Sequence, residues 1–90
     1  MKYRLFTTHA FRRSFKKLAL NDRQFQAFVD VVAKLLNGFP LEKKYKDHPL
    51  KGEYKGFREC HLKADLLLVY KLEGDVLKLV EIGSHSDLFV

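Results

Sequence analysis

Apolar side chains recur every three or four positions through the N-terminal part of the chain, which is the period of amphipathic helices. A first helix is predicted to begin at Thr7 or Thr8, because either hydroxyl can accept a hydrogen bond from a free backbone N–H of the first turn. Phe11, Phe15 and Leu18 then share one face of this helix. Four basic residues fall largely outside that face and are expected to be exposed: Arg12, Arg13, Lys16 and Lys17.

A second helix is predicted with clearer boundaries. Asn21 and Gln24 have the spacing of a capping box, in which each side chain bonds the backbone N–H of the other residue. Gly38 can take the left-handed conformation that ends many helices, and Pro40 cannot continue one. Between these limits, six apolar residues follow the spacing of one buried stripe: Phe25, Phe28, Val29, Val32, Leu35 and Leu36.

Beyond the second helix the pattern changes to turns and strands. Residues 40–52 contain two prolines and a glycine among lysines, which predicts an irregular, exposed basic segment. Four strands are predicted, over residues 2–7, 54–62, 66–72 and 76–82. Residues 66–70 are apolar without interruption, which favours a central strand. Residues 63–65 and 73–75 have the length and residue types of hairpin connections.

The predicted element order is β-α-α-β-β-β, an α+β fold in which two N-terminal helices cover a small antiparallel sheet. A chain of 90 residues forms a single core, so one domain over residues 1–90 is expected. Its longest apolar run, residues 66–70, is far shorter than the ~20 residues of a membrane-spanning helix. No apolar segment of signal-peptide length follows Met1, and the single cysteine, Cys60, excludes an internal disulfide. These features favour a cytoplasmic protein.

Charge narrows the choice of partner. Seventeen basic residues against eleven acidic ones give a net charge of +6. Such an excess attracts polyanions, although a merely soluble basic protein has the same balance. The distribution is more informative, because one segment holds six cations against two acidic residues. The cations are Lys43, Lys44, Lys46, Lys51, Lys55 and Arg58.

Three histidines lie beside polar or turn residues in the second half of the chain: His48, His61 and His85. Histidine titrates near neutral pH, so a group of them can both accept and donate a proton. Asp65, four residues after His61, either orients an imidazole or serves only as a turn residue. All four side chains can bind zinc, but their spacings match no short metal motif and the flanking lysines repel a cation. No metal or other cofactor is expected.

Cleavage of RNA by attack of its own 2′-hydroxyl needs a base, an acid and fixed cations around the phosphate. The histidines and the lysine-rich segment contain these groups without a metal. Tyr54, Phe57 and Phe89 lie among the cations and can stack on bases, although core packing is favoured for Phe57 because it falls in a predicted strand. A passive RNA-binding module without catalysis is the other interpretation of these features.

Three ordered blocks of sequence carry a resemblance to a known family. They are YKDHPL at residues 45–50, KGFRECHLKAD at residues 55–65 and GSHSDLF at residues 83–89. Together they resemble the YafQ branch of the RelE/ParE toxin superfamily. The similarity extends over nearly the whole chain, and three blocks in a fixed order are more specific than any one motif.

The resemblance implies a toxin of a type II toxin–antitoxin system with a RelE-like fold. Such toxins are endoribonucleases that cut mRNA, typically in the ribosomal A site, and a cognate antitoxin silences each of them. No membrane contact is implied, and DNA is contacted only through the antitoxin. By resemblance, the active site holds His48, His61, Asp65 and His85, with Phe89 as a C-terminal aromatic contact. We expect His85 to act as general acid, His48 or His61 as general base, and Asp65 as an orienting partner.

Two positions depart from the family pattern. Leu66 stands where an aromatic residue often follows the aspartate, and Glu81 stands where an arginine commonly supports the scissile phosphate. A carboxylate a few ångströms from a phosphate is repelled by about 1 kcal/mol or more. We therefore expect a cation from elsewhere to replace the arginine, with Lys46, Lys51 and Arg58 as candidates. Arg58 is equally suited to be a structural anchor.

The superfamily leaves a second function open. ParE-type proteins share the fold but bind DNA gyrase and cleave no RNA. The three histidines argue against that function, whereas the acidic residue at position 81 keeps it open.

Overall fold

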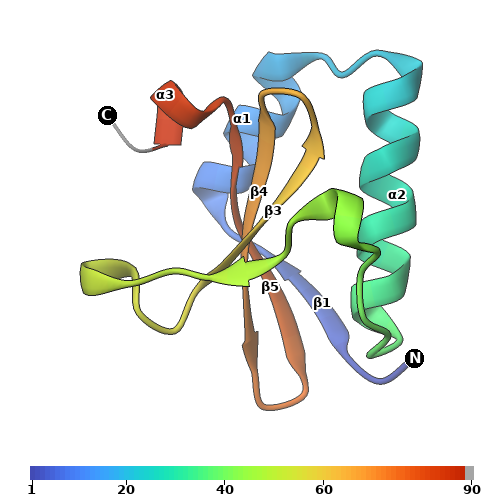
Figure 1. Ribbon diagram of the computed structural model, residues 1–90, viewed down its shortest axis with the longest axis vertical. Helices are drawn as coiled ribbons and strands as arrows, with labels where there is room; N and C mark the ends of the chain where they lie inside the picture. The colour runs from blue at the N-terminus through green and yellow to red at the C-terminus, as the bar shows by residue number, and fades with distance from the viewer. Residues whose placement is uncertain (89–90) are drawn as a thin grey trace.

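The computed structural model describes residues 1–88, which form one five-stranded sheet with helices packed against it (Figure 1). The strands are β1 (Arg4–Thr7), β2 (His48–Pro49), β3 (Arg58–Lys63), β4 (Leu66–Glu73) and β5 (Val76–Gly83). The helices are α1 (His9–Leu18), α2 (Asp22–Leu36) and α3 (His85–Leu88), with short 3₁₀ turns η1 (Lys43–Tyr45) and η2 (Gly52–Tyr54). No helix within this part of the chain has the length and apolar character needed to cross a membrane.

The predicted helix boundaries are confirmed. Thr8 caps α1, because its hydroxyl accepts a hydrogen bond from the backbone N–H of Phe11. Asn21 and Gln24 form both hydrogen bonds of the capping box at the start of α2. The chain leaves α2 through Gly38, whose φ of +74° lies in the left-handed region that favours glycine. The cations of α1 are exposed, as predicted.

The predicted buried stripe of α2 is partly wrong. Phe25 and Val29 are 49% and 41% exposed, whereas Ala27 and Val31, outside the predicted stripe, are buried. The helix turns its 27–31–35 face toward the sheet and its Phe25–Phe28 edge toward α1. There Phe28 packs against Phe15 with ring centroids 4.9 Å apart. Because α2 packs against α1 as well as against the sheet, its buried face differs from the face that the spacing of its apolar residues predicts.

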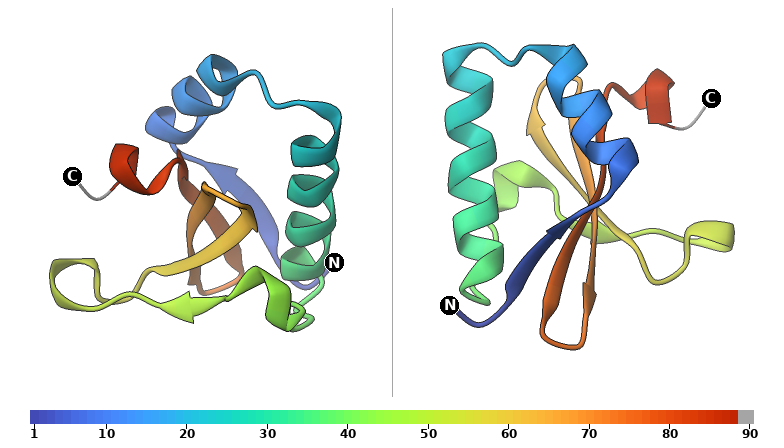
Figure 2. Two further views of the ribbon diagram at one scale, coloured as in Figure 1. Left: turned by 45° about the horizontal axis from the view of Figure 1, so that its top comes forward. Right: turned by 180° about the vertical axis from the view of Figure 1, so that it is seen from behind.

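The sheet is mixed, not antiparallel as predicted. Its strand order is β1-β5-β4-β3-β2, and β1 pairs parallel with β5 while the other neighbours are antiparallel. A parallel pair needs a long connection, and here nearly the whole chain lies between its first and last strands. The α+β architecture with two N-terminal helices beside the sheet is confirmed (Figure 2).

Strand boundaries differ from the prediction at the start of the second predicted strand. It was expected from residue 54, but β3 begins at Arg58 because η2 and Gly56, with a φ of +98°, turn the chain first. The basic segment before it is not wholly irregular. Tyr45 is buried, and β2 adds a two-residue strand to the edge of the sheet.

Side chains alternate between the two faces of the central strands. On β3 and β4, Cys60, Leu68 and Tyr70 join the core beneath α1 and α2. The residues between them point to the opposite face, which we call the distal face: Glu59, His61, Leu67 and Val69, with Glu81 beside Val69 on β5. In Figures 1 and 2, α3 and the segment carrying η2 lie away from α2. The sheet thus has the hydrophobic core on one side and the distal face on the other.

Two leucines on the same face of β4 test this core. Leu68 has no exposed surface and Leu72 is 40% exposed. We expect Leu68→Ala to lower the free energy of unfolding by about 2–5 kcal/mol, because it leaves a cavity. Leu72→Ala, the control, is expected to cost less than about 1 kcal/mol in the same urea titration. Equal losses would contradict the assigned core.

Cys60 makes stability depend on pH in the alkaline range. Burial, together with the charges of Asp47 and Glu59, raises the pKa of its thiol to about 12. In the unfolded chain a thiol ionises near pH ~8.5, so only the unfolded state releases this proton as the pH rises further. Between about pH 8.5 and pH 10, the free energy of unfolding should fall by up to about 1.4 kcal/mol per pH unit from this group. Cys60→Ala should remove that slope in urea titrations, and an unchanged slope would contradict this account.

Candidate active site

A buried carboxylate on β3 gathers two imidazoles. His48 lies directly opposite Glu59 in the β2–β3 pair, and His61 follows Glu59 by two residues on the same face. The Nε2 atoms of His48 and His61 lie 3.4 and 3.7 Å from the same Glu59 oxygen, Oε1. The two rings are 6.2 Å apart between centroids. Only 6% of the Glu59 side chain is exposed, against 45% for His48 and 30% for His61. The Glu59 carboxylate is therefore covered, whereas both imidazoles reach solvent.

The chain before β2 fixes the ring of His48. Lys46 adopts a left-handed conformation with a φ of +49°, which turns its carbonyl toward the following histidine. The Nδ1 atom of His48 lies 2.6 Å from this carbonyl oxygen. Both ring nitrogens of His48 therefore face oxygen atoms, Nδ1 the Lys46 carbonyl and Nε2 the Glu59 carboxylate.

Arg58 lies on the other side of the sheet from these histidines. Its guanidinium donates to Asp47, with Nη2 3.2 Å from Oδ2, and its Nε lies 3.3 Å from the Tyr70 hydroxyl. Tyr70 in turn donates to Asp47, and burial raises the pKa of its hydroxyl above the ordinary value, with the Asp47 bond as the next cause. This network holds Asp47, the neighbour of His48, against the core. The structure thus favours the anchor role for Arg58 over contact with an RNA phosphate.

A basic hollow adjoins His61. Its volume is about 270 Å³, and it is lined by His61 together with Lys44, Lys46 and Lys63. Lys46 is one of the cations expected to contact phosphate. The sequence did not indicate that Lys44 and Lys63 would line the same hollow. Lys51 is exposed at the start of η2 and does not line this hollow. Three lysines therefore lie beside His61, one of the two imidazoles that face Glu59.

Asp65 contacts His85 through the backbone. Its Oδ1 accepts a hydrogen bond from the His85 N–H at 3.2 Å, which joins the β3–β4 turn to the start of α3. Asp87 closes the same turn of chain by accepting a hydrogen bond from the backbone N–H of Ser84. Hydrogen bonding by the side chain of Ser84, and next by its backbone, lowers the pKa of the Asp87 carboxyl. The imidazole of His85 is on the surface and lines neither the basic hollow nor a second hollow, which is bordered by Val69 and Glu81.

The predicted site residues therefore fall into two pairs, His48 with His61 and Asp65 with His85. Both pairs include a residue of the β3–β4 hairpin. Phe89 lies outside the described residues. Within residues 1–88, no group of three or more histidine, cysteine or acidic side chains has the geometry to hold a metal ion.

Glu81 lies two strands away from Glu59, with Val69 between them on the distal face. Its carboxylate accepts a hydrogen bond from the backbone N–H of Ile82 at 3.0 Å. It also borders a hollow that contains Lys17 of α1. Neighbouring strands are ~4.8 Å apart, so Glu81 stands roughly 10 Å from Glu59 across the sheet.

Glu59 is the site residue that sequence analysis missed. A signal for it exists in the alternation of β3, because a charged residue two positions before His61 must point to the same face. Its burial depends on β2 and on the segment before it, whose position the sequence did not indicate.

Comparison with known proteins agrees with this fold. The sequence model of the family described as "Bacterial toxin of type II toxin-antitoxin system, YafQ" matches residues 3–90. The mRNA interferase toxin YafQ of Escherichia coli (strain K12) is 45% identical over 53 residues, which cover 59% of this chain and 58% of that protein. The matched stretch thus spans less than two thirds of this curated relative.

Solved structures are similar over almost their full length. A mutant toxin from Helicobacter pylori, solved with copper bound, is 39% identical with a TM-score of 0.90 and covers 97% of this chain and 99% of its own. A chain of the E. coli DinJ-YafQ complex is 30% identical with a TM-score of 0.85, over 98% and 99%. With the family match, these likenesses show that the chain belongs to the YafQ family of bacterial toxins of type II toxin–antitoxin systems.

Proposed function

We propose that this protein is an mRNA interferase, an endoribonuclease that cuts mRNA by general acid–base catalysis with histidines. Membership of the YafQ family and the relative named an mRNA interferase support the activity. The observation that carries the mechanism is the buried Glu59 carboxylate between the exposed edges of His48 and His61, with a lysine-lined hollow beside it.

In the proposed reaction, His48 or His61 takes the proton of a ribose 2′-hydroxyl. The freed oxygen attacks the adjacent phosphorus, and the bond to the 5′-oxygen of the next nucleotide breaks. The imidazole becomes positively charged in this step, and the nearby Glu59 carboxylate stabilises that charge electrostatically. The products are a 2′,3′-cyclic phosphate and a 5′-hydroxyl. The route uses side chains alone.

His85 is the proposed general acid, which gives a proton to the departing 5′-oxygen. Its place at the start of α3 leaves the ring accessible, and Asp65 holds its backbone against the β3–β4 turn. Asp65 is thus proposed as a positioning residue, which acts through the backbone of His85.

The cations of the basic hollow are the proposed contacts for the RNA phosphates. Lys46 is placed there with Lys44 and Lys63, close to His61. Lys51 and Phe89 are proposed as further contacts of the RNA. Because Glu81 stands two strands from Glu59, the lysines take the role of the arginine expected at its position.

The proposed partners follow from the substrate and from the family. We propose that the toxin acts on mRNA in the ribosomal A site, and therefore in the cytoplasm. The E. coli YafQ chain was solved in complex with DinJ, which supports a cognate antitoxin for this protein. A net charge of +6 suits an antitoxin whose binding segment is acidic. Contact with DNA is proposed only through that antitoxin.

Replacement of His85 tests the proposed acid. Loss of a general acid costs roughly 10²–10⁴-fold in rate, so His85→Ala should reduce mRNA cleavage by that factor. Primer extension on mRNA from expressing cells measures it, with His9→Ala, another exposed histidine, as the control. Undiminished cleavage by a folded His85→Ala protein would remove His85 from the mechanism. DNA damage without mRNA cuts in cells expressing the unmodified protein would instead support the ParE-type function.

Replacement of Glu59 tests the shared carboxylate. Glu59→Gln keeps the shape of the side chain and removes its charge, so cleavage should fall by roughly 10²-fold. Glu59→Asp, which keeps the charge, should retain more activity than the amide. Glu42→Gln is the control, because Glu42 is an exposed partner of Lys34. Cleavage by Glu59→Gln equal to that of the control would show that the charge between the two imidazoles is not used.

A further inference from the structure

We propose that a second hollow on the distal face is a nucleobase subsite, which selects bases that carry an amino group for a nucleotide flanking the cleaved linkage. The inference rests on the proposed function, because it assigns this site to the same RNA. The hollow has a volume of about 370 Å³, within the ~300–1,000 Å³ of small-molecule sites. It is separate from the basic hollow beside His61.

The subsite is next to the proposed catalytic carboxylate. The registers of the sheet align His48, Glu59, Val69 and Glu81 in one row across β2, β3, β4 and β5. Val69 lines the hollow, so the hollow begins one strand, ~4.8 Å, from Glu59. A base attached to a ribose at the cleaved linkage has this distance to cross. The phosphate and the base of one nucleotide can therefore occupy neighbouring positions of the same row.

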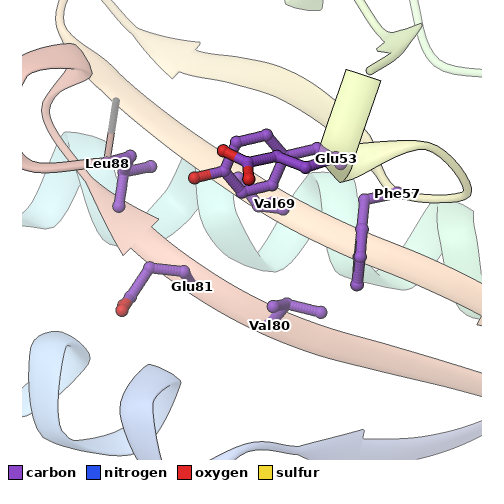
Figure 3. Close-up of a pocket in the computed structure, with 7 residues that line it drawn as sticks. Glu53, Phe57, Val69, Val80, Glu81 and Leu88 are labelled. Atoms are coloured by element: carbon purple, nitrogen blue, oxygen red, sulfur yellow. The ribbon is translucent and has the colours of Figure 1, made fainter. Parts of the chain in front are cut away.

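The walls of the hollow suit a flat, apolar ring. Val69 and Val80 are aliphatic, and Tyr54 and Phe57 supply aromatic faces. Figure 3 shows Phe57 and Leu88 at opposite ends of the hollow, with Val69 and Val80 between them. Aromatic side chains stack on every base, which gives affinity without distinguishing one base from another.

One carboxylate supplies the discrimination. Glu53 extends from η2 toward the middle of the hollow, whereas Glu81 lines it on β5 with its carboxylate directed away from Val69 and Phe57 (Figure 3). The Ile82 N–H holds one oxygen of Glu81 in that position. An ionised carboxylate only accepts hydrogen bonds, so Glu53 favours the amino groups of adenine, cytosine and guanine. Uracil has no amino group, and its single N–H donor lies between two carbonyl oxygens that a carboxylate repels.

Binding of nucleotides tests the subsite without any cleavage. We expect AMP, CMP and GMP to shift the NMR signals of Val69 and Val80 at lower concentrations than UMP does. Glu53→Gln should reduce that difference, whereas Tyr54→Leu should weaken the binding of all four nucleotides alike. Phe39→Leu, at an exposed aromatic residue outside the hollow, is the control. Equal shifts with the four nucleotides, or none at Val69 and Val80, would overturn the proposal.

Mapping of mRNA ends in expressing cells tests it during the reaction. We expect uridine to be depleted at one of the two positions flanking the cuts. Glu53→Gln should raise its frequency there by roughly tenfold, the effect of one lost charged hydrogen bond. Glu73→Gln, in the β4–β5 hairpin, is the control. Cuts without base preference would overturn the subsite alone, whereas base-selective binding without any cuts would overturn the proposed nuclease and leave the subsite standing.

Discussion

The arrangement of the site depends on one buried negative charge. A carboxylate taken out of water is costly unless charged or hydrogen-bonding groups face it. Glu59 is almost completely covered, and the Nε2 atoms of His48 and His61 face the same carboxylate oxygen. The two imidazoles come from different strands, so this charge holds β2 against β3 while leaving the ring edges of both histidines in solvent.

Strand β3 serves two purposes through its alternation. One face carries Cys60 into the core and Arg58 into the network with Asp47 and Tyr70. The other carries Glu59 and His61. Because Asp47 is adjacent to His48, the network on the core side holds the chain next to a residue of the proposed site on the distal face. Stability and the proposed chemistry are therefore coupled through this short segment, although the groups that carry them lie on opposite faces of the sheet.

Local signals predicted much of the fold. The capping residues fixed both helix starts, and the three hairpin strands were predicted in the right order. What periodicity did not show depends on distant contacts: the parallel partner of β1, the exposure of Phe25 and the burial of Glu59. The histidines were found by residue type and resemblance. Their grouping into pairs was not predicted, because it requires β2, a strand of two residues, to be placed first.

A structure of the protein bound to an mRNA whose 2′-hydroxyls are methylated would show where the RNA lies, because that substrate cannot react. We expect a phosphate beside Nε2 of His48 or His61, on the exposed side of Glu59, with lysines of the basic hollow around it. An RNA bound across α1 and α2, with both imidazoles out of reach of every phosphate, would contradict it.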